Sequence, residues 1–104
     1  MEGNLLKKIE SDIDGVIQLL REVTELETPS NRKELVDELG SLVFQHLRAN
    51  GLVPQVVPRE EVGDIIWAES AGEKEGRILV LCHIDTVWES GSLAVNPFRV
   101  EEGK

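Results

Sequence analysis

A run of apolar residues that ends in a histidine and an aspartate constrains this chain more than any other feature. Residues 77–87 are Arg-Ile-Leu-Val-Leu-Cys-His-Ile-Asp-Thr-Val. The five consecutive apolar residues 78–82 are typical of a β-strand that is buried on both faces. The sequence therefore predicts a strand over residues 77–82, with other structure covering each side of it.

This strand would carry His83 and Asp85 at its C-terminal end. Because side chains alternate along an extended chain, residues two apart point the same way, and these two should lie side by side. Open α/β sheets bind their ligands at this end of the strands. A carboxylate beside an imidazole commonly orients a metal-bound histidine. One histidine cannot hold a catalytic zinc by itself, because such a site takes about three protein ligands.

Two amphipathic helices are expected before the strand. The first spans residues 4–26, where apolar residues recur every three or four positions, and residues 28–30 (Thr-Pro-Ser) end it. Its apolar stripe consists of Leu5, Ile9, Ile13, Val16, Leu20 and Val23. The second helix is expected to start with Asn31 as its cap and Glu34 at the reciprocal position, and to stop at residues 50–51 (Asn-Gly). Its apolar face consists of Leu35, Leu39, Leu42, Val43 and Leu47.

Shorter apolar segments predict the rest of a sheet. Residues 52–57 and 64–69 are expected to be strands, joined by a turn at residues 63–64 (Gly-Asp). A polar turn then leads to the strand at 77–82, and residues 98–101 alternate like the start of another strand.

This order of elements places the chain in the α/β class. We expect two N-terminal helices followed by a mixed β-sheet, all within one domain over residues 1–104. The two helices can cover one face of the sheet, but no further segment is expected to cover the other. A strand that is apolar on both faces needs both layers, so the sequence predicts an incomplete domain.

Charge and composition exclude several classes of partner. The formal net charge is −9, with 20 acidic and 11 basic residues, which disfavours binding to nucleic acid. No apolar run approaches the roughly 20 residues of a membrane span, and the N-terminus lacks the pattern of a signal peptide. The single cysteine excludes an internal disulfide. We therefore expect a soluble, cytoplasmic protein that binds neither nucleic acid nor membranes.

With these residues in place, the chain resembles the N-terminal part of the M20 family of zinc metallopeptidases, which includes glutamate carboxypeptidases and related deacylases. Residues 79–87, followed by Gly91 and residues 97–99 (Pro-Phe-Arg), are similar to the first metal motif of that family, in which His-x-Asp-x-Val closes a buried strand. Residues 27–30 (Glu-Thr-Pro-Ser) resemble the loop between the first two helices of the family. The resemblance covers nearly the whole chain.

The resemblance implies a role for each residue of the motif. His83 would be a ligand of one of two zinc ions, and Asp85 would be the catalytic aspartate that orients the imidazole. The complete site would cleave an amide bond of a peptide or an N-acyl amino acid, using a metal-bridging water and a glutamate as general base. The metal-bridging aspartate of the family would follow a segment like residues 100–104, and the other ligands would come later still. The chain is thus expected to be an N-terminal fragment of the catalytic domain, inactive by itself.

Simpler explanations exist for the same side chains. A histidine at the end of an apolar strand is more often a hydrogen-bonded or capping residue than a ligand, and Asp85 would fit as a turn residue. Cys82 is expected to be packed rather than reactive. Trp67 is expected in the core, whereas Trp88 is a candidate for the wall of a substrate cleft.

Two other functions fit the sequence. The chain could be a non-catalytic interaction module with a peptidase-like half-fold, whose uncovered sheet face is covered by a partner or by a second copy in a homodimer. It could also be a mononuclear metal-binding protein that completes its site across a dimer. Within the peptidase-like hypothesis, related deacetylases and desuccinylases share the same first motif, so the motif does not define the substrate.

Overall fold

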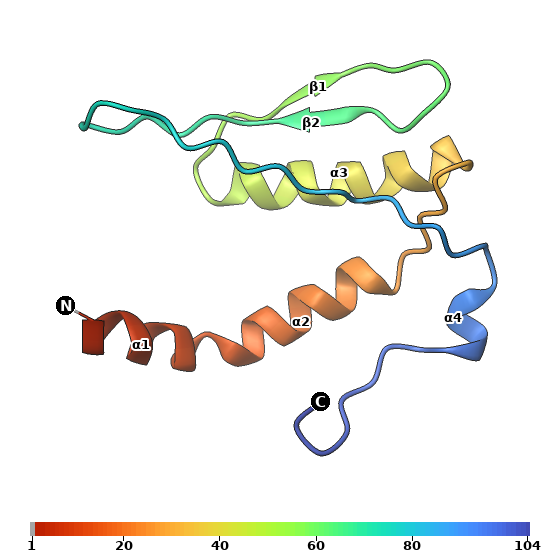
Figure 1. The fold of residues 1–104 in the computed structure, drawn as a ribbon, viewed down its shortest axis with the longest axis horizontal. Coiled ribbons are helices and arrows are strands. Elements are labelled where there is room, and N and C mark those ends of the chain that lie inside the picture. The colour runs from red at the N-terminus through yellow and green to blue at the C-terminus, as the bar shows by residue number, and fades with distance from the viewer. Residues whose placement is uncertain (1) are drawn as a thin grey trace.

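The structure is a computed structural model that describes residues 2–104, and it confirms a chain of the α/β class (Figure 1). Its elements in order are α1 (Glu2–Ser11), α2 (Ile13–Thr24), α3 (Lys33–Ala49), β1 (Gln55–Val57), β2 (Ile65–Trp67) and α4 (Ser92–Val95). None of the helices in this range combines the length and the apolar character that a membrane span requires.

The predicted N-terminal helix is present but is divided at Asp12 into α1 and α2. The Asp12 N–H is shared between the carbonyl oxygens of Lys8, at 3.1 Å, and Ile9, at 3.2 Å, which tightens the turn. The Ser11 hydroxyl donates to the same Lys8 carbonyl at 2.8 Å and so competes with the backbone. The hydrogen bonding around Ser11 and Asp12 accounts for the division.

Helix α3 has Arg32 as its N-cap rather than the predicted Asn31. The Arg32 N–H donates to the Pro29 carbonyl oxygen at 2.9 Å, and this turn places Asn31 before the helix. Glu34 accepts a hydrogen bond from the Arg32 side chain at 2.6 Å, so the predicted capping box is not formed. The C-terminal prediction is confirmed, because Gly51 takes the left-handed conformation with φ at 84°.

Strands β1 and β2 form an antiparallel hairpin beside α3 (Figure 1). Both lie within their predicted ranges but are shorter. The register pairs Gln55 with Trp67, Val56 with Ile66, and Val57 with Ile65. The buried residues of α3 are Val36, Leu39 and Gly40. A Cβ atom on Gly40 would lie 3.6 Å from Ile66 Cδ1, so the small core forms where the helix meets the hairpin.

Residues 77–82 do not form the predicted buried strand. The segment is unpaired, and its apolar side chains are exposed by 94% at Ile78, 65% at Leu79, 76% at Val80 and 83% at Leu81. A strand of this composition forms when a neighbouring strand takes up its hydrogen bonds and other layers cover both faces. Within residues 2–104 neither the neighbouring strand nor the covering layers are present, and the chain remains irregular.

Two smaller predictions are also wrong. Residues 98–101 form no strand, because Glu101 and Lys104 exchange backbone hydrogen bonds of 2.9 and 2.8 Å and close a turn. Trp67 does not lie in the core, since it is 44% exposed on the outer side of the two-stranded sheet.

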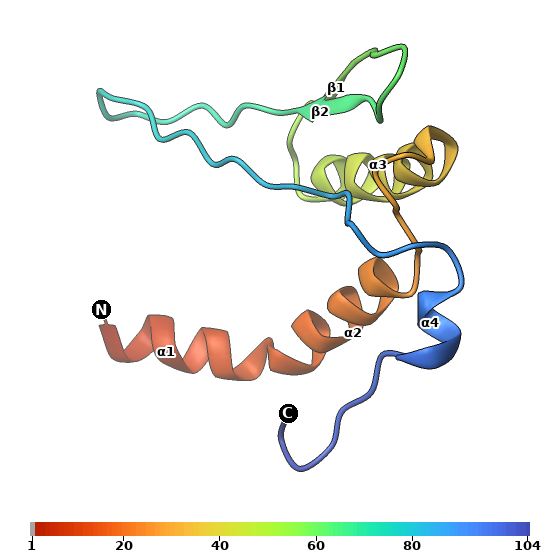
Figure 2. The ribbon, with the colours of Figure 1, turned by 45° about the vertical axis from the view of Figure 1, so that its right-hand side comes forward.

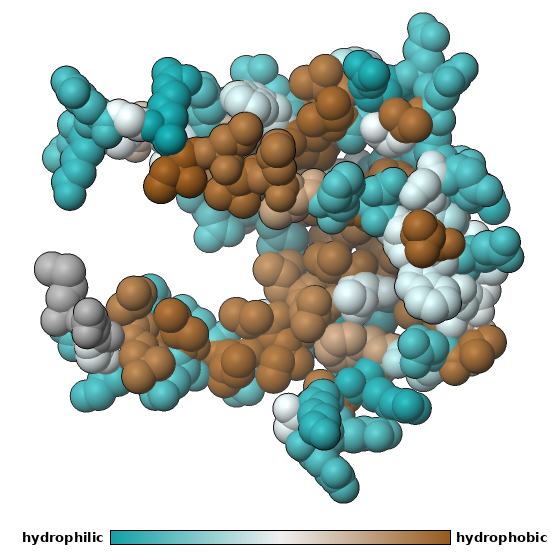
Figure 3. All heavy atoms as spheres, in the orientation of Figure 1, coloured by the Kyte–Doolittle hydropathy of each residue, from teal (hydrophilic) through white to brown (hydrophobic). Residues whose placement is uncertain are grey.

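The described chain is more open than a compact domain of its length. Its radius of gyration is 16.3 Å, whereas about 13 Å is expected. Its accessible surface is 9182 Å², whereas about 5,800 Å² is expected for a folded monomer of 11.6 kDa. Figure 2 shows helices α1 and α2 as an arm that stands apart from α3 and the hairpin. Figure 3 shows the apolar surface of this arm and that of residues 78–81 on opposite sides of an open gap.

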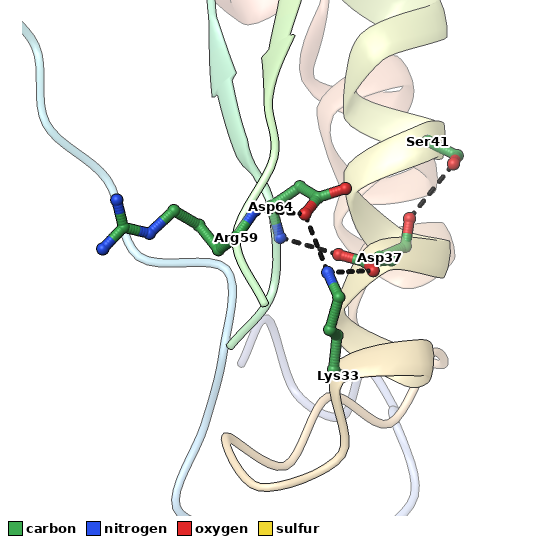
Figure 4. Close-up of polar contacts among 5 residues, drawn as sticks. All are labelled: Lys33, Asp37, Ser41, Arg59 and Asp64. Carbon is green, nitrogen blue, oxygen red and sulfur yellow. Dashed lines mark hydrogen bonds and ion pairs between the residues drawn. The ribbon is translucent and has the colours of Figure 1, made fainter. Parts of the chain in front are cut away.

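Lys33 joins the start of α3 to the hairpin (Figure 4). Its Nζ atom lies 2.8 Å from Asp37 Oδ2 and 2.7 Å from Asp64 Oδ1. The Asp64 N–H donates to Asp37 Oδ1 at 2.7 Å, and the Arg59 N–H donates to Asp64 Oδ1 at 2.8 Å. Hydrogen bonds to Asp37 and Asp64 raise the pKa of Lys33, while those from Lys33 and Arg59 lower the pKa of Asp64. These contacts fix the hairpin against the helix.

Gly63 and Gly40 provide a matched test of the contact between the hairpin and α3. A Cβ atom on Gly63 would lie 2.3 Å from Val36 Cγ1, so Gly63→Ala should lower the free energy of unfolding by about 1–3 kcal/mol. Gly40→Ala would make only ordinary contacts, at 3.6 to 3.8 Å, and removes a helical glycine that costs about 1 kcal/mol. It should therefore be neutral or stabilising. Chemical denaturation of the full-length protein measures both effects, and an unchanged Gly63→Ala protein would contradict the packing described.

Lys33→Met should lower the melting temperature, because it leaves two half-buried carboxylates without their cation. Lys74→Met, in the exposed turn at 71–76, is the control. The folded-state pKa of Asp64 lies below its ordinary value of 3.8, so the stability it contributes is present above that pH and is lost as the pH falls through the folded pKa. The difference between wild type and Lys33→Met should therefore shrink at strongly acidic pH. Thermal melts between neutral and acidic pH check this, and a constant difference would count against the assignment.

Candidate functional site

The loop between α2 and α3 pairs with the chain just after Asp85. The Thr86 N–H donates to the Thr28 carbonyl oxygen at 2.8 Å, and the Ser30 N–H donates to the Thr86 carbonyl oxygen at 2.9 Å. These bonds form a parallel bridge between Pro29 and Thr86. Thr28 is buried, with 5% of its surface exposed. We call this contact the loop clasp, and it holds residues 28–30 against residue 86.

A second contact lies next to the loop clasp. The Glu27 carboxylate accepts a hydrogen bond from the Gly91 N–H, at the start of α4. Gly91 has φ at 98°, a conformation that glycine adopts without steric cost. The Arg21 guanidinium lies over the Phe98 ring, 4.7 Å from its centroid, and so links α2 to residues 97–99. The segments singled out in the sequence at 27–30, 83–87, 91 and 97–99 therefore gather around the end of α2.

His83 and Asp85 lie next to each other, as their spacing predicts. The His83 Nδ1 atom is 3.6 Å from Asp85 Oδ1, which is an ion-pair distance rather than a hydrogen bond. The His83 side chain is 97% exposed, and that of Asp85 is 39% exposed. The imidazole is therefore open to a ligand or to further protein groups, while the carboxylate is partly enclosed.

Asp85 is stabilised in its charged form. A hydrogen bond from the Ser30 side chain is the largest cause that lowers its pKa, and its own backbone N–H and the neighbouring His83 act in the same direction. Partial burial of the carboxylate opposes the shift without reversing it. The side chain is thus kept as a carboxylate, the form that can accept a hydrogen bond from an imidazole N–H.

A groove of about 540 Å³ runs beside this pair. Its lining comes from the end of α2 and the loop after it, from Leu39 of α3, from residues 83–89 and from α4, and it includes His83, Asp85 and Trp88. Trp88 is 69% exposed and forms part of the wall, the position for which its place in the sequence makes it a candidate. Apolar walls with a few polar groups are typical of small-molecule sites.

Cys82 does not behave as predicted. The sequence places it on the packed side of a strand, but its side chain is exposed. The cause is the same as for the rest of residues 77–82, which lack cover in the described chain. The other histidine, His46, lies in the last turn of α3, away from His83. Its Nε2 atom is 3.4 Å from Oε2 of Glu22 on α2.

His83 and Asp85 are the candidate donor groups for a metal ion at this position. Among residues 2–104 there is no group of three or more His, Cys, Asp or Glu side chains placed to hold a metal ion. What the structure provides is one exposed imidazole with a carboxylate beside it. Ser30 and Glu27 were not assigned roles from the sequence. In the sequence, the one feature that marks them is that both belong to the Glu-Thr-Pro-Ser segment. That segment alone does not predict that Ser30 contacts Thr86 or that Glu27 contacts Gly91.

A comparison with curated proteins found a relative of this chain. No family model matches the chain. Carboxypeptidase G2 from Pseudomonas sp. (strain RS-16) is 30% identical over 94 residues, which cover 86% of this chain and 22% of the relative. The chain therefore spans about a fifth of the length of this relative. These findings show a distant relation to a peptidase.

Proposed function

We propose that this chain supplies the first part of the catalytic domain of a zinc-dependent carboxypeptidase or amide hydrolase of the M20 type. His83 is the metal ligand in this proposal, and Asp85 orients it. The observation that carries the proposal is the placement of His83 beside Asp85 in a chain distantly related to a carboxypeptidase. By itself the segment would be inactive, because a catalytic zinc takes about three protein ligands.

The chemistry of the pair fits this role. A carboxylate near His83 Nδ1 favours the tautomer with the proton on that nitrogen, which leaves Nε2 free for a metal ion. The low pKa of Asp85 keeps the carboxylate charged at neutral pH. Under the proposal, the other ligands and the general base come from polypeptide outside residues 2–104. The chemistry supplied by two bound zinc ions is activation of a water molecule and stabilisation of developing negative charge.

The open shape supports the same proposal. The chain exposes over half as much surface again as a compact monomer of its mass. The excess includes the apolar faces of α1 and α2 and of residues 78–81, which face each other across the gap in Figure 3. Burial of apolar surface on this scale is what further layers of a catalytic domain would provide. In such a domain, residues 77–82 would become the buried strand that their sequence favours.

The proposed substrate is a peptide or an N-acyl amino acid. The groove beside His83 has an apolar wall that includes Trp88, suited to a substrate side chain next to the reacting amide. Hydrolysis assays with dipeptides, N-acetyl and N-succinyl amino acids would separate the carboxypeptidase from the related deacetylase and desuccinylase activities.

His83→Ala should remove most zinc-dependent hydrolysis in the full-length protein while leaving the fold intact. The side chain is 97% exposed, so its truncation removes a ligand without opening the core. His46→Ala, on α3, is the control and should keep both zinc and activity. Zinc content, hydrolysis rate and metal-free melting temperature are the measurements. A fully active His83→Ala protein would overturn the proposal.

Asp85→Asn should weaken zinc affinity or activity by roughly 10- to 100-fold, the usual effect of removing a carboxylate that orients a ligating histidine. The amide keeps the size of the side chain but not its charge. Asp14→Asn, in the first turn of α2, provides the matched control. Zinc titration with a competing chelator measures the change, and equal affinities for Asp85→Asn and wild type would contradict the assigned role.

The exposed apolar faces of α1, α2 and residues 78–81 also favour a second candidate function. A non-catalytic interaction module would use them to bind a partner or a second copy of the chain. Sedimentation of the full-length protein separates the two functions. A self-associating protein without bound zinc or hydrolysis supports the module, whereas a zinc-containing hydrolase supports the peptidase.

A further inference from the structure

The segment from Thr86 to Gly91 is a loop whose two ends are held by two neighbouring residues. At one end, the Thr86 N–H donates to the Thr28 carbonyl oxygen at 2.8 Å. At the other end, the Gly91 N–H donates to the Glu27 carboxylate. Glu27 directly precedes Thr28 in the chain. The segment therefore starts and ends against the same short stretch after α2, and we call residues 86–91 the wall loop.

The wall loop forms one side of the groove beside His83. Trp88 and Glu89 lie in the middle of the loop and line the groove together with α4, which follows the loop. Figures 1 and 2 both place α4 beside the end of α2. Trp88 is 69% exposed, so packing within the chain does little to fix its side chain. The position of Trp88 therefore depends on the backbone of the loop that carries it.

Glu27 makes the one hydrogen bond that joins residues 87–96 to another element of the described chain. The other hydrogen bonds of this segment within residues 2–104 stay local, as does the bond of 3.3 Å from the Trp88 N–H to Thr86 Oγ1. A hydrogen bond to a charged acceptor is roughly twice as strong as one between neutral groups. The Glu27 carboxylate is thus the main polar restraint on the far end of the wall loop.

This restraint is separate from the proposed metal motif. His83 and Asp85 precede the wall loop, and the loop clasp that follows them consists of backbone hydrogen bonds at Thr86. These bonds do not use the Glu27 side chain. Removal of the Glu27 carboxylate therefore releases the end of the wall loop at Gly91 while the loop clasp still holds the end next to Asp85.

We propose that Glu27 is a positioning residue, which holds the wall loop in place so that Trp88 contacts the apolar side chain of a bound substrate. This inference rests on the proposed function. It extends that function by assigning selection of the substrate side chain to a contact that zinc binding does not require.

Steady-state hydrolysis by the full-length protein tests this role. The probes are N-acetyl amino acids, N-succinyl amino acids and alanyl dipeptides, each with phenylalanine or glycine as the C-terminal residue. Glu27→Ala should raise KM for the phenylalanine probes by about 10-fold at an unchanged kcat, since a lost hydrogen bond to a charged group weakens the binding it supports by roughly that factor. KM for the glycine probes should not change, because glycine has no side chain to contact Trp88.

Three variants serve as comparisons for Glu27→Ala. Glu27→Gln keeps an oxygen that can accept the Gly91 N–H, so it should retain most of the affinity. Glu27→Asp withdraws the carboxylate by one methylene, so it should raise KM and replaces Glu27→Ala if that variant does not fold. The matched control is Glu73→Ala in the exposed turn at 71–76, which should behave like wild type.

Amide hydrogen exchange of the same proteins measures the hold on the wall loop without a substrate. Glu27→Ala should speed exchange in residues 87–91, while exchange in residues 28–30 and the zinc content stay unchanged. In a Trp88→Ala background, Glu27→Ala should raise KM no further, because its effect on the substrate passes through Trp88.

The outcomes separate this role from the proposed function. Unchanged KM or unchanged exchange in Glu27→Ala would overturn the role of Glu27 and leave the zinc hydrolase standing. A further rise of KM in the Trp88→Ala background would make Glu27 a direct substrate contact, and a loss of zinc would assign it to the metal motif; either result overturns the positioning role. A wild-type protein that binds no zinc and hydrolyses none of the probes would overturn both the proposed function and the role of Glu27.

Discussion

The pairing of residues 28–30 with Thr86 is the interaction on which the candidate site depends. It joins the loop between α2 and α3 to the segment that follows His83 and Asp85, through backbone hydrogen bonds of 2.8 and 2.9 Å. These bonds are formed by backbone groups, so they are insensitive to most side-chain changes. Together with the contact between Glu27 and Gly91, they bring together segments that are more than 50 residues apart.

A second constraint is that the described chain has much more apolar surface than its own packing buries. Helix α3 carries the small buried core of the described chain, Val36, Leu39 and Gly40, and the Lys33 ion pairs fix the hairpin against this helix. The apolar faces of α1, α2 and residues 78–81 have no cover within the described chain. Exposed apolar surface on this scale is unfavourable in water, and it is the physical reason to expect packing against further structure.

Local patterns predicted the local elements well. The helical periodicity of residues 4–26 and 33–49, the left-handed glycine at 51 and the two hairpin strands are all present, because each depends on short-range geometry. The strand at 77–82 was predicted from composition alone and is absent, because a doubly apolar strand exists only with its neighbours. The exposed positions of Cys82 and Trp67 have the same cause.

The sequence by itself determined that His83 and Asp85 lie on one side of the chain, because residues two apart in an extended segment point the same way. The sequence also contains the resemblance to the M20 family, on which the role proposed for this pair depends. Only the tertiary structure decided that Glu27 and Trp88 line the groove beside this pair and that Ser30 is bonded to Thr86. Contacts between distant segments depend on how helices and loops pack, and no periodicity in the sequence records them.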